Sequence, residues 1–384
     1  MRAPFSYDDS LKLLSTLQTN RAIRTSLDAT TDKNKDAIPE MLEWFRKAGY
    51  EPADLARSGI KCVHVAGSSG KGSVCAMIEN LLVHHQDYED VDAVASERIQ
   101  GQLEKIGTYT SPHLVDAGII RAEPPAFTAP QVQGALEVVL RRAAVMDTIT
   151  LGLLGDFQKD NASLAVVAAA AFLRDIGVDA ESLPTPDEIA DGDPLPDRFV
   201  RGLETVSWPG RCEIYKNGNL EWCLDGAHTD EGMRAVAKWF RGKMDAAYAE
   251  TDTATMLIFN QDERDGNALL CTLIEALTDL EEGAVHYSRM FKFAAFCPNE
   301  AFPVAKGEEE RDLSKQQKLL RTYMNMDRNA VAAVYSSVGE AVHAAVRVSD
   351  RTKQRALVLV TGSLHLVGAW IENVPEKHRL RSGK

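Results

Sequence analysis

The sequence has few features that would place the chain in a membrane, in a secretory pathway or in a metal-binding class. No run of 18 or more consecutive apolar residues occurs, so no membrane-spanning helix is expected. The six cysteines are dispersed, with no C-x-x-C pair and no accompanying histidine spacing, which argues against a zinc site and against a disulfide framework. We therefore expect reduced thiols in an intracellular protein. Asp8 and Asp9, close to the start, argue against a secretory or conventional mitochondrial presequence.

Positive charge is in deficit. Lys and Arg number 43 against 56 Asp and Glu, which gives a formal net charge of −13. A phosphate surface would repel such a chain, so we expect neither nucleic acid nor an anionic membrane as a partner. With 384 residues, 45% of them hydrophobic, the chain can bury a large core, and its length suggests two domains.

One stretch, residues 60–82, combines an expected strand, a glycine-rich turn and an expected helix without interruption. An apolar run over residues 62–66 is typical of a buried parallel strand, and residues 73–82 have apolar side chains at helical spacing. A turn of this kind points backbone N–H groups at an anion, and its lysine adds a full positive charge. The stretch therefore predicts a polyphosphate site built from Gly67, Ser68, Ser69, Gly70, Lys71, Gly72 and Ser73.

The spacing of this turn differs from the usual P-loop pattern G-x-x-x-x-G-K-[ST]. Two residues separate Gly67 from Gly70, and Gly72 stands between Lys71 and Ser73. The alternative is a strand-to-helix turn without a ligand, but a lysine in such a turn has little structural use. We expect the hydroxyl of Ser73, in the first helical turn, to be available to a phosphate-bound Mg²⁺.

The pattern elsewhere predicts an α/β fold of two domains, residues 1–207 and 208–384. In the first domain we expect a strand over residues 105–109, helices over residues 7–18, 38–48, 130–145 and 161–173, and a proline-rich, acidic linker over residues 178–207. In the second, strands alternate with helices, which favours a mostly parallel, Rossmann-like sheet. The dinucleotide fingerprint is missing there, so this topology does not imply NAD. The expected strands cover residues 212–215, 220–224, 255–260, 285–288 and 356–361, and the expected helices cover residues 231–242, 267–280, 314–326 and 338–347.

Many separate motifs, in one order along the chain, resemble those of the folylpolyglutamate synthase branch of the Mur-type amide ligases. The resemblance implies a P-loop ATP-binding domain, here reduced, followed by a Rossmann-like carboxyl-terminal ligase domain. The motifs are VHVAGSSGKGSVCA, GTYTSPHL, LGLLGDFQKDNASLAV, WPGR, LDGAHT, LIFNQDERD, FCPN and LVTGSLHLVG, preceded by SYDDSLKLLSTLQTN and IPEMLEWFRKAGY.

This resemblance implies ATP-dependent addition of L-glutamate to the γ-carboxylate of a reduced folate polyglutamate, through an acyl phosphate. The implied cofactors are ATP and Mg²⁺, and the partners are small molecules. We expect a monomer without membrane insertion, in the cytoplasm, with the mitochondrion as the alternative. No motif in the sequence indicates direct recognition of a pteridine ring.

The resemblance also implies roles for single residues. It assigns Lys71 and His228 to catalysis, and Asn161, Arg211 and Asp225 to ATP together with the glycine-rich turn. For Asn161 the alternative is a helix N-cap, and for Asp225 a buried structural aspartate. The remaining assignments are Ser73 and Ser111 to the metal ion, and His113, Asn260, Arg264, Ser363 and His365 to the substrates. Ser111 and His113 have a second interpretation, as residues that cap a turn.

The chain also departs from the family pattern. Residues 116–121 replace an arginine-rich segment, and Phe157 stands where the family has a histidine. A glutamate in a glycine-rich turn, a histidine after a G-L-D motif and a carbamylated lysine have no counterpart. Well over a hundred residues of the pattern are missing around residues 127–151.

Three hypotheses compete. The first is an active folylpolyglutamate synthase, or a near relative that ligates an amino acid to another carboxylic acid. The second is an ATP-binding pseudoenzyme, and the third is an ordinary enzyme whose sequence here is truncated or lacks an exon.

Overall fold

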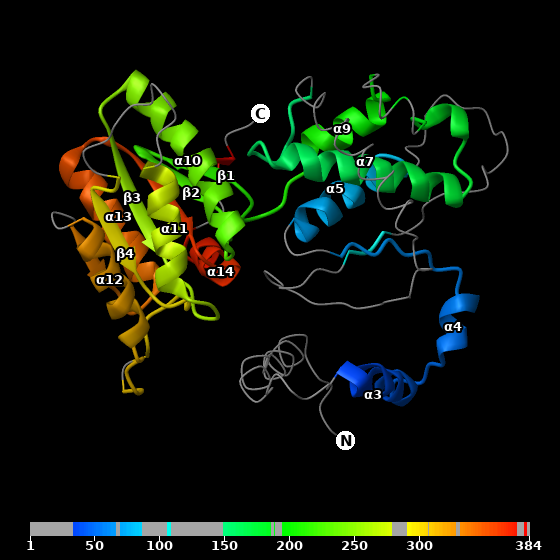
Figure 1. Cartoon of the computed structure of the whole chain (residues 1–384), viewed down its shortest axis with the longest axis horizontal. Coiled ribbons are helices and arrows are strands. Elements are labelled where there is room, and N and C mark those ends of the chain that lie inside the picture. The colour runs from blue at the N-terminus through cyan, green and yellow to red at the C-terminus, as the bar shows by residue number, and fades with distance from the viewer. Residues whose placement is uncertain are drawn as a thin grey trace. The chain divides into compact units, whose positions relative to one another are not determined.

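A computed structural model describes residues 34–66, 70–86, 106–108, 149–185, 188, 194–278, 290–305, 307–327, 331–374 and 380–381. The chain divides into two compact units, Met1–Cys62 and Val63–Lys384, each of which is described by itself. The first contains helices α3 (Asn34–Lys47) and α4 (Pro52–Arg57) (Figure 1). The helix expected over residues 38–48 is thus confirmed as α3, and the one expected over residues 7–18 lies outside the described residues.

The second unit begins with a helical layer. Its members are α5 (Lys71–Val83), α7 (Gln158–Asp175), the short 3₁₀ helix η2 (Ala180–Ser182) and α9 (Asp197–Thr205). Helix α7 confirms the helix expected over residues 161–173. The small residues of α7 let α5 approach closely. Met77 and Leu81 of α5 share one fully buried cluster with Ala165 and Leu173 of α7. This cluster positions the amino-terminal end of α5, where the glycine-rich turn ends.

Three expectations for this region are wrong. Residues 62–66 belong to no strand, and residues 106–108, the described part of the other expected strand, also pair with nothing in the described chain. A strand forms only where a neighbour pairs with its backbone, and apolar composition alone cannot supply that neighbour.

The third concerns the expected linker, part of which is the packed helix α9. Its Phe199 and Leu203 are fully buried against α5. Prolines interleaved with acidic residues before this helix predict a linker, but they do not show the apolar face that α9 buries.

All strands of the described chain lie after Trp208, in one seven-stranded sheet of order β5-β4-β3-β6-β2-β1-β7. Five adjacent strands, from β5 to β2 in this order, run parallel to one another. Strand β1 pairs antiparallel with β2 and with β7. The strands are β1 (Glu213–Asn217), β2 (Leu220–Leu224), β3 (Thr253–Phe259), β4 (Phe293–Phe296), β5 (Ala332–Val334), β6 (Arg355–Thr361) and β7 (Leu380–Arg381). The mostly parallel sheet expected in this half is confirmed.

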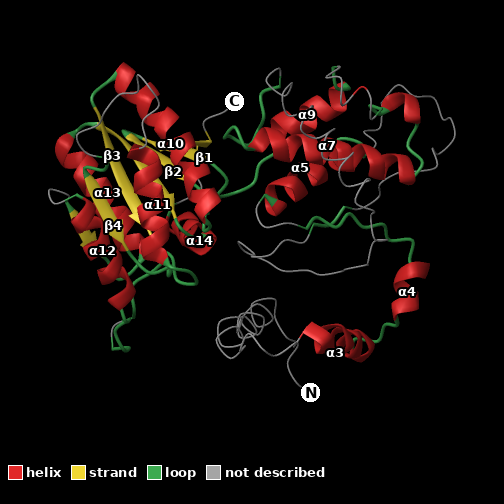
Figure 2. Cartoon of the chain, in the orientation of Figure 1, coloured by secondary structure: helices red, strands yellow, loops and turns green. Residues whose placement is uncertain are grey.

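Helices cover both faces of this sheet (Figure 2). They are α10 (Asp230–Glu250), α11 (Gly266–Thr278), α12 (Ser314–Met326), α13 (Val338–Thr352) and α14 (Leu364–Asn373). Alternate residues of the central strands point to opposite faces. Leu257 and Phe259 of β3 therefore pack with α10, α11 and α12, while Met256 and Ile258 pack with α13 and α14.

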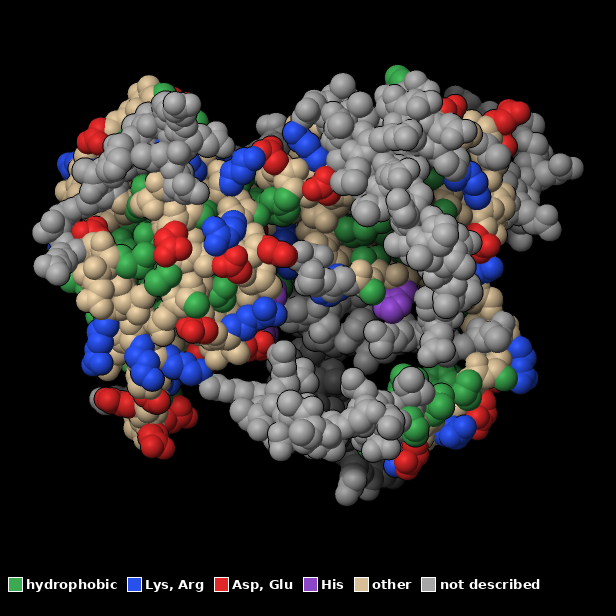
Figure 3. All heavy atoms as spheres, viewed as in Figure 1, with side chains coloured by type: hydrophobic (Ala, Val, Ile, Leu, Met, Phe, Trp, Pro, Cys, Tyr) green, Lys and Arg blue, Asp and Glu red, His purple; other side chains and the backbone are tan. Residues whose placement is uncertain are grey.

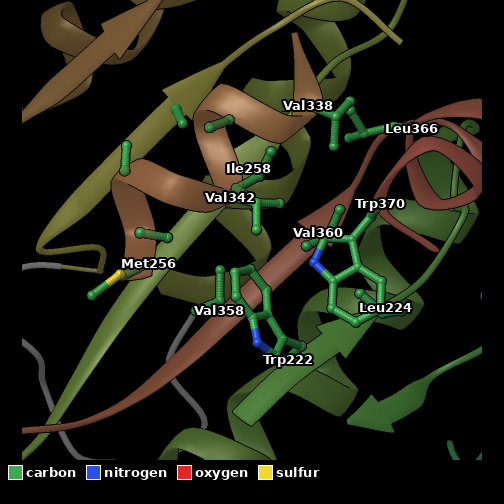
Figure 4. Packing of buried hydrophobic residues seen from close by; sticks show 14 of the residues in the cluster. Trp222, Leu224, Met256, Ile258, Val338, Val342, Val358, Val360, Leu366 and Trp370 are labelled. Atoms are coloured by element: carbon green, nitrogen blue, oxygen red, sulfur yellow. The ribbon is translucent and has the colours of Figure 1, made fainter. Parts of the chain in front are cut away.

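Two tryptophans anchor the second of these faces. Trp222 of β2 and Trp370 of α14 have ring centroids 5.3 Å apart, and Figure 4 shows Val358 and Val360 of β6 beside them. Burial of large aromatic and branched side chains on both faces is what holds a parallel sheet together. The α/β class is therefore confirmed.

The pattern located most elements of this domain but missed four. The helix expected over residues 314–326 and the strand expected over residues 220–224 are found with those bounds, as α12 and β2. Strands β4, β5 and β7 and helix α14 are not among the expected elements, because three short strands and a glycine-containing helix give weak periodic signals. The strand expected over residues 285–288 lies outside the described residues, as does the helix expected over residues 130–145.

Charged side chains of both signs lie on the surface. On the face in Figure 3, acidic and basic side chains of the described residues are interspersed. Within the described part of the chain, no helix is both long and apolar enough to cross a membrane.

Candidate functional site

The amino-terminal end of α5 is the described part of the expected phosphate site. Gly70 is its N-cap, with φ +76°, and as a glycine it has no side chain to cap the helix. A Cβ at Gly70 would come within 2.5 Å of Asn161 Oδ1, so a larger residue here would displace the Asn161 amide, and the positive φ also favours glycine. The first backbone N–H groups of a helix have no partner within that helix, and Lys71 adds positive charge next to them. This arrangement suits a phosphate group.

A chain of side-chain hydrogen bonds lies beneath this turn. Asn161 Nδ2 donates to Gln158 Oε1 over 2.8 Å, and Gln158 Nε2 donates to Ser73 Oγ over 3.4 Å. Gln158 and Ser73 are buried, and Asn161 is half-buried. Phe157, not Asn161, is the N-cap of α7, so the capping alternative for Asn161 is wrong. Asn161 instead joins α7 to the phosphate turn.

A second group of expected residues surrounds the WPGR turn. Gly210 and Cys212, on either side of Arg211, both have positive φ, +71° and +49°. A left-handed conformation is unusual for a residue with a Cβ, so the surroundings must impose it at Cys212. The Gly210 carbonyl accepts a hydrogen bond from the Gly226 N–H over 2.9 Å, which ties the turn to the end of β2. The backbone on both sides of Arg211 is thereby held.

Asp225 holds this turn through hydrogen bonds to its backbone, and it is only 4% exposed. Its Oδ2 accepts a hydrogen bond from the backbone N–H of Cys212, and its Oδ1 accepts one from the backbone N–H of Ala227, both over 2.8 Å. Burial raises the pKa of Asp225, while Arg211 and these N–H groups act in the opposite direction. Both oxygens are thus engaged by the protein, as the structural alternative for Asp225 requires. A contact to ATP from this residue stays a prediction.

His228 lies just beyond Asp225, half-buried. Its Nδ1 is 2.9 Å from the Gly226 carbonyl, which can only accept, so Nδ1 carries the proton in this contact. Burial lowers the pKa of His228, the Gly226 contact opposes this, and the positive charges of Arg211 and Arg264 lower it further. The ring is therefore held neutral near pH 7 with Nε2 as an acceptor, in the neighbourhood of two arginines.

The residues expected to contact substrate have different roles. Arg264 and His365 are exposed at the carboxyl-terminal edge of the sheet. Ser363 is 7% exposed and caps α14 by accepting from the His365 N–H. Asn260 is wholly buried, and its amide makes hydrogen bonds with Asp262, Asn299 and Gln316. The polar atoms of Asn260 already bind neighbouring side chains, and a contact of Asn260 to substrate stays a prediction.

Some assigned residues lie outside the described part of the chain. They are Gly67, Ser68 and Ser69 of the glycine-rich turn, and Ser111 and His113. Among the residues that are described, no group of three or more His, Cys, Asp or Glu could hold a metal ion. Ser73, the other assigned metal ligand, is buried and accepts from Gln158. A metal ion here would need its remaining ligands from a bound phosphate and from residues that are not described.

Comparison with known proteins supports the motifs. Residues 211–373 match the family model of the dihydrofolate synthetase C-terminal domain. Folylpolyglutamate synthases from strains of Saccharomyces cerevisiae are 24% identical to 94% of this chain, over 86% of their own length. The resemblance that the motifs indicated is confirmed. This alignment is 497 positions long, against 384 residues in the chain, so more than a hundred of its positions have no residue of this chain opposite them.

Solved structures of similar proteins have lower coverage. A Mycobacterium tuberculosis folylpolyglutamate synthase complexed with ADP and AMPPCP is 18% identical, with a TM-score of 0.38 over 60% of this chain and 42% of its own. Escherichia coli FolC in complex with ADP is 19% identical, with a TM-score of 0.35 over 56% of this chain and 38% of its own. The chain thus spans less than half the length of these solved chains.

Proposed function

We propose, on the premise that this chain is related in sequence to the folylpolyglutamate synthases, that it is an ATP-dependent acid–amino-acid ligase. The reaction is addition of L-glutamate to the γ-carboxylate of a reduced folate polyglutamate. ATP phosphorylates the carboxylate to an acyl phosphate, the glutamate amine attacks its carbonyl carbon, and phosphate leaves. The proposed reaction follows from the resemblance to folylpolyglutamate synthases. The residues described above provide side chains and backbone N–H groups suited to bind its substrates.

The observation that carries the proposal is the amino-terminal end of α5. Its glycine N-cap, its uncapped backbone N–H groups and Lys71 form an anion site, and the packing of Asn161 and Gln158 holds it in place. A preorganised set of donors stabilises charge that develops on a transferring phosphoryl group. We assign Lys71 to this role and the turn to the β- and γ-phosphates. Asn161 lies beside the turn and is proposed to contact the nucleotide.

The edge of the sheet supplies a second set of groups. Arg211 is directed by a turn that Asp225 and Gly226 fasten, and a guanidinium suits bidentate phosphate or carboxylate recognition. The neutral His228 presents Nε2, which can accept a proton or a hydrogen bond from an incoming ammonium group. Arg264 is proposed to bind a carboxylate of the amino acid.

A divalent cation, which we propose to be Mg²⁺, would neutralise charge on the phosphates. The residue present for it is Ser73, whose hydroxyl is an oxygen ligand of the kind that Mg²⁺ prefers. The phosphates themselves would supply further oxygens.

The test is ligation of glutamate by the purified full-length chain, measured by mass spectrometry of folate products with ATP, Mg²⁺ and L-glutamate. Products longer by one glutamate support the proposal. Their absence, with ATP hydrolysis that depends on a different acid, identifies a ligase for another carboxylic acid.

A second candidate is an ATP-binding pseudoenzyme. It is favoured by the alignment, in which more than a hundred positions of the yeast relatives are unmatched, and by the absence from the sequence of the glutamate, histidine and lysine motifs. Binding of ATP in calorimetry without any turnover would select it. Sequencing the transcript across residues 127–151 would show whether an exon is missing.

A further inference from the structure

The carboxyl-terminal ends of β3 and β6 are neighbours, yet the chain leaves them in opposite directions. Ile258 of β3 pairs with Val360 of β6 in parallel register. After β3 the chain enters α11, which packs on one face of the sheet, and after β6 it enters α14, on the other face. Ligands of open α/β sheets bind where loops part in this way. Arg264 lies in the loop that follows β3.

Gln261, next in the chain after Asn260, bridges these two strand ends with one side chain. It is 6% exposed, and its Nε2 donates to the Gly362 carbonyl over 2.8 Å. Its Oε1 accepts from the backbone N–H of Glu263 over 2.7 Å and from that of Arg264 over 3.2 Å. The donor side of the amide is thus tied to β6, and the acceptor side holds the backbone of Arg264 itself.

A glycine after β6 makes this bridge possible. Gly362 has φ +110°, and a Cβ there would come within 2.3 Å of the Asn260 carbonyl oxygen. Without a side chain at this position, the two strand ends approach closely enough for Gln261 to reach across.

A second brace holds the same loop from the α12 side. Asp262 Oδ2 accepts from Asn260 Nδ2 and from Asn299 Nδ2, both over 3.0 Å. Lys315 of α12 donates to the Asp262 carbonyl over 3.0 Å. The backbone on both sides of Gln261 is therefore fixed, whereas the side chain of Arg264 remains exposed.

We propose that Gln261 is a positioning residue that fixes Arg264 at the edge of the sheet, so that its guanidinium is preorganised for a carboxylate of the amino-acid substrate. The identity of that anion rests on the proposed function. The arrangement does not, because the hydrogen bonds of Gln261 exist without any ligand. A supporting group held by buried hydrogen bonds is what keeps a binding residue in its productive geometry.

The test uses the charge of Arg264 as a reporter and needs neither substrate nor turnover. The pKa of His228, which Arg211 and Arg264 lower and Glu263 raises, is measured by NMR titration in four full-length proteins. These are the wild type, Arg264→Gln, Gln261→Met and the double variant. Methionine keeps the length and apolar stem of glutamine but removes its donor and its acceptor.

If Gln261 positions Arg264, Arg264→Gln raises the pKa of His228 in the wild-type background, and this rise is lost in the Gln261→Met background. An equal rise in both backgrounds overturns the proposal. Gln317→Met, at an exposed glutamine of α12, is the matched control and should leave the rise unchanged.

A conservative variant guards against simple unfolding. Gln261→Glu keeps an acceptor for the N–H groups of Glu263 and Arg264, so the rise on Arg264→Gln should return in that background. If Gln261→Met melts at a much lower temperature than the wild type, the Gln261→Glu background is used to test the positioning role instead. Failure of Arg264→Gln to raise the pKa of His228 in that background contradicts the proposal. Where the chain shows ligase activity, Gln261→Met should raise KM for glutamate more than it lowers kcat. If the wild type shows no ligase activity, while Arg264→Gln still raises the pKa of His228 and Gln261→Met abolishes that rise, the proposed function is rejected and the positioning role is kept.

Discussion

The helical layer of α5, α7 and α9 and the seven-stranded sheet are held together in different ways. In the sheet domain, each central strand is paired on both sides, and helices cover both faces. In the helical layer, the described residues contain no strand, and a single cluster of apolar side chains joins the helices. The proposed phosphate site lies in this helical layer, at the amino-terminal end of α5.

The difference shows how much a site depends on the domain around it. At the edge of the sheet, Asp225 and Gln261 each hold a loop through hydrogen bonds to distant backbone groups. At the amino-terminal end of α5, support comes from two side chains of one neighbouring helix, Gln158 and Asn161. We expect the loss of Lys71, at the amino-terminal end of α5, to act on ligand binding and the loss of Asp225, at the sheet edge, to act on stability. The predictions below test this contrast, from the largest expected effect to the smallest.

Substitution Lys71→Ala should abolish ATP binding. It removes the full positive charge from the first turn of α5, and the partial charges of the backbone N–H groups that remain are weaker. Isothermal calorimetry with ATP and Mg²⁺ measures the effect. Lys318→Ala, at an exposed lysine of α12, is the control and should bind like the wild type. Unchanged ATP affinity in Lys71→Ala would refute the phosphate-site assignment.

The chain as it stands should bind ATP but ligate glutamate poorly. The family's glutamate, histidine and carbamylated lysine have no counterpart in the sequence, and loss of one transition-state contact of this kind costs a factor of about 10²–10³ in rate. Glutamate incorporation into folate should be compared with that of the yeast relative under the same conditions. Robust formation of folate polyglutamates would show that other residues complete the site.

At the sheet edge, Asp225→Ala should lower the free energy of unfolding. The change leaves the buried N–H groups of Cys212 and Ala227 without their acceptor, at a cost of about 1–3 kcal/mol for each group. Urea denaturation followed by tryptophan fluorescence measures it. Asp225→Asn, which retains one acceptor oxygen, should lose less. An Asp225→Ala protein as stable as the wild type would mean that the WPGR turn does not depend on this carboxylate.

The smallest effect concerns the packing of α5 against α9. His85 is 7% exposed, its ring lies 5.0 Å from that of Phe199, and burial lowers its pKa from 6.5. The unfolded chain therefore takes up a proton that the folded chain resists, and stability falls as pH drops from about 6.5 toward the lower folded pKa. The slope is at most about 1.4 kcal/mol per pH unit.

Replacing His85 with phenylalanine should remove this contribution. Thermal melts of the wild type and of His85→Phe are compared between pH 7.5 and 5, a range that brackets the free histidine pKa of about 6.5. The melting temperature of the variant should depend less on pH than that of the wild type. Parallel curves would mean that His85 is as free to take up a proton in the folded protein as in the unfolded chain.

The sequence by itself determined the periodic elements and the chemical groups. Mostly apolar runs predict strands β2, β3 and β6, because strands buried on both faces have few polar positions. Helical spacing predicts α7, α10 and α12. The lysine in a glycine-rich turn and the many ordered motifs predict an ATP-dependent ligase. These properties are local, so they can be read from neighbouring residues.

The tertiary structure alone decided which side chains hold the loops in place. Gln261 lies in one of the quoted motifs, but the sequence does not show its role, because its partner Gly362 lies about a hundred residues later and is brought near only by the order of strands in the sheet. For the same reason the sequence could not show that Asn260 is engaged by Asp262, Asn299 and Gln316, or that residues 62–66 are unpaired. Contacts between distant segments depend on which strands become neighbours, and apolar periodicity does not specify that order.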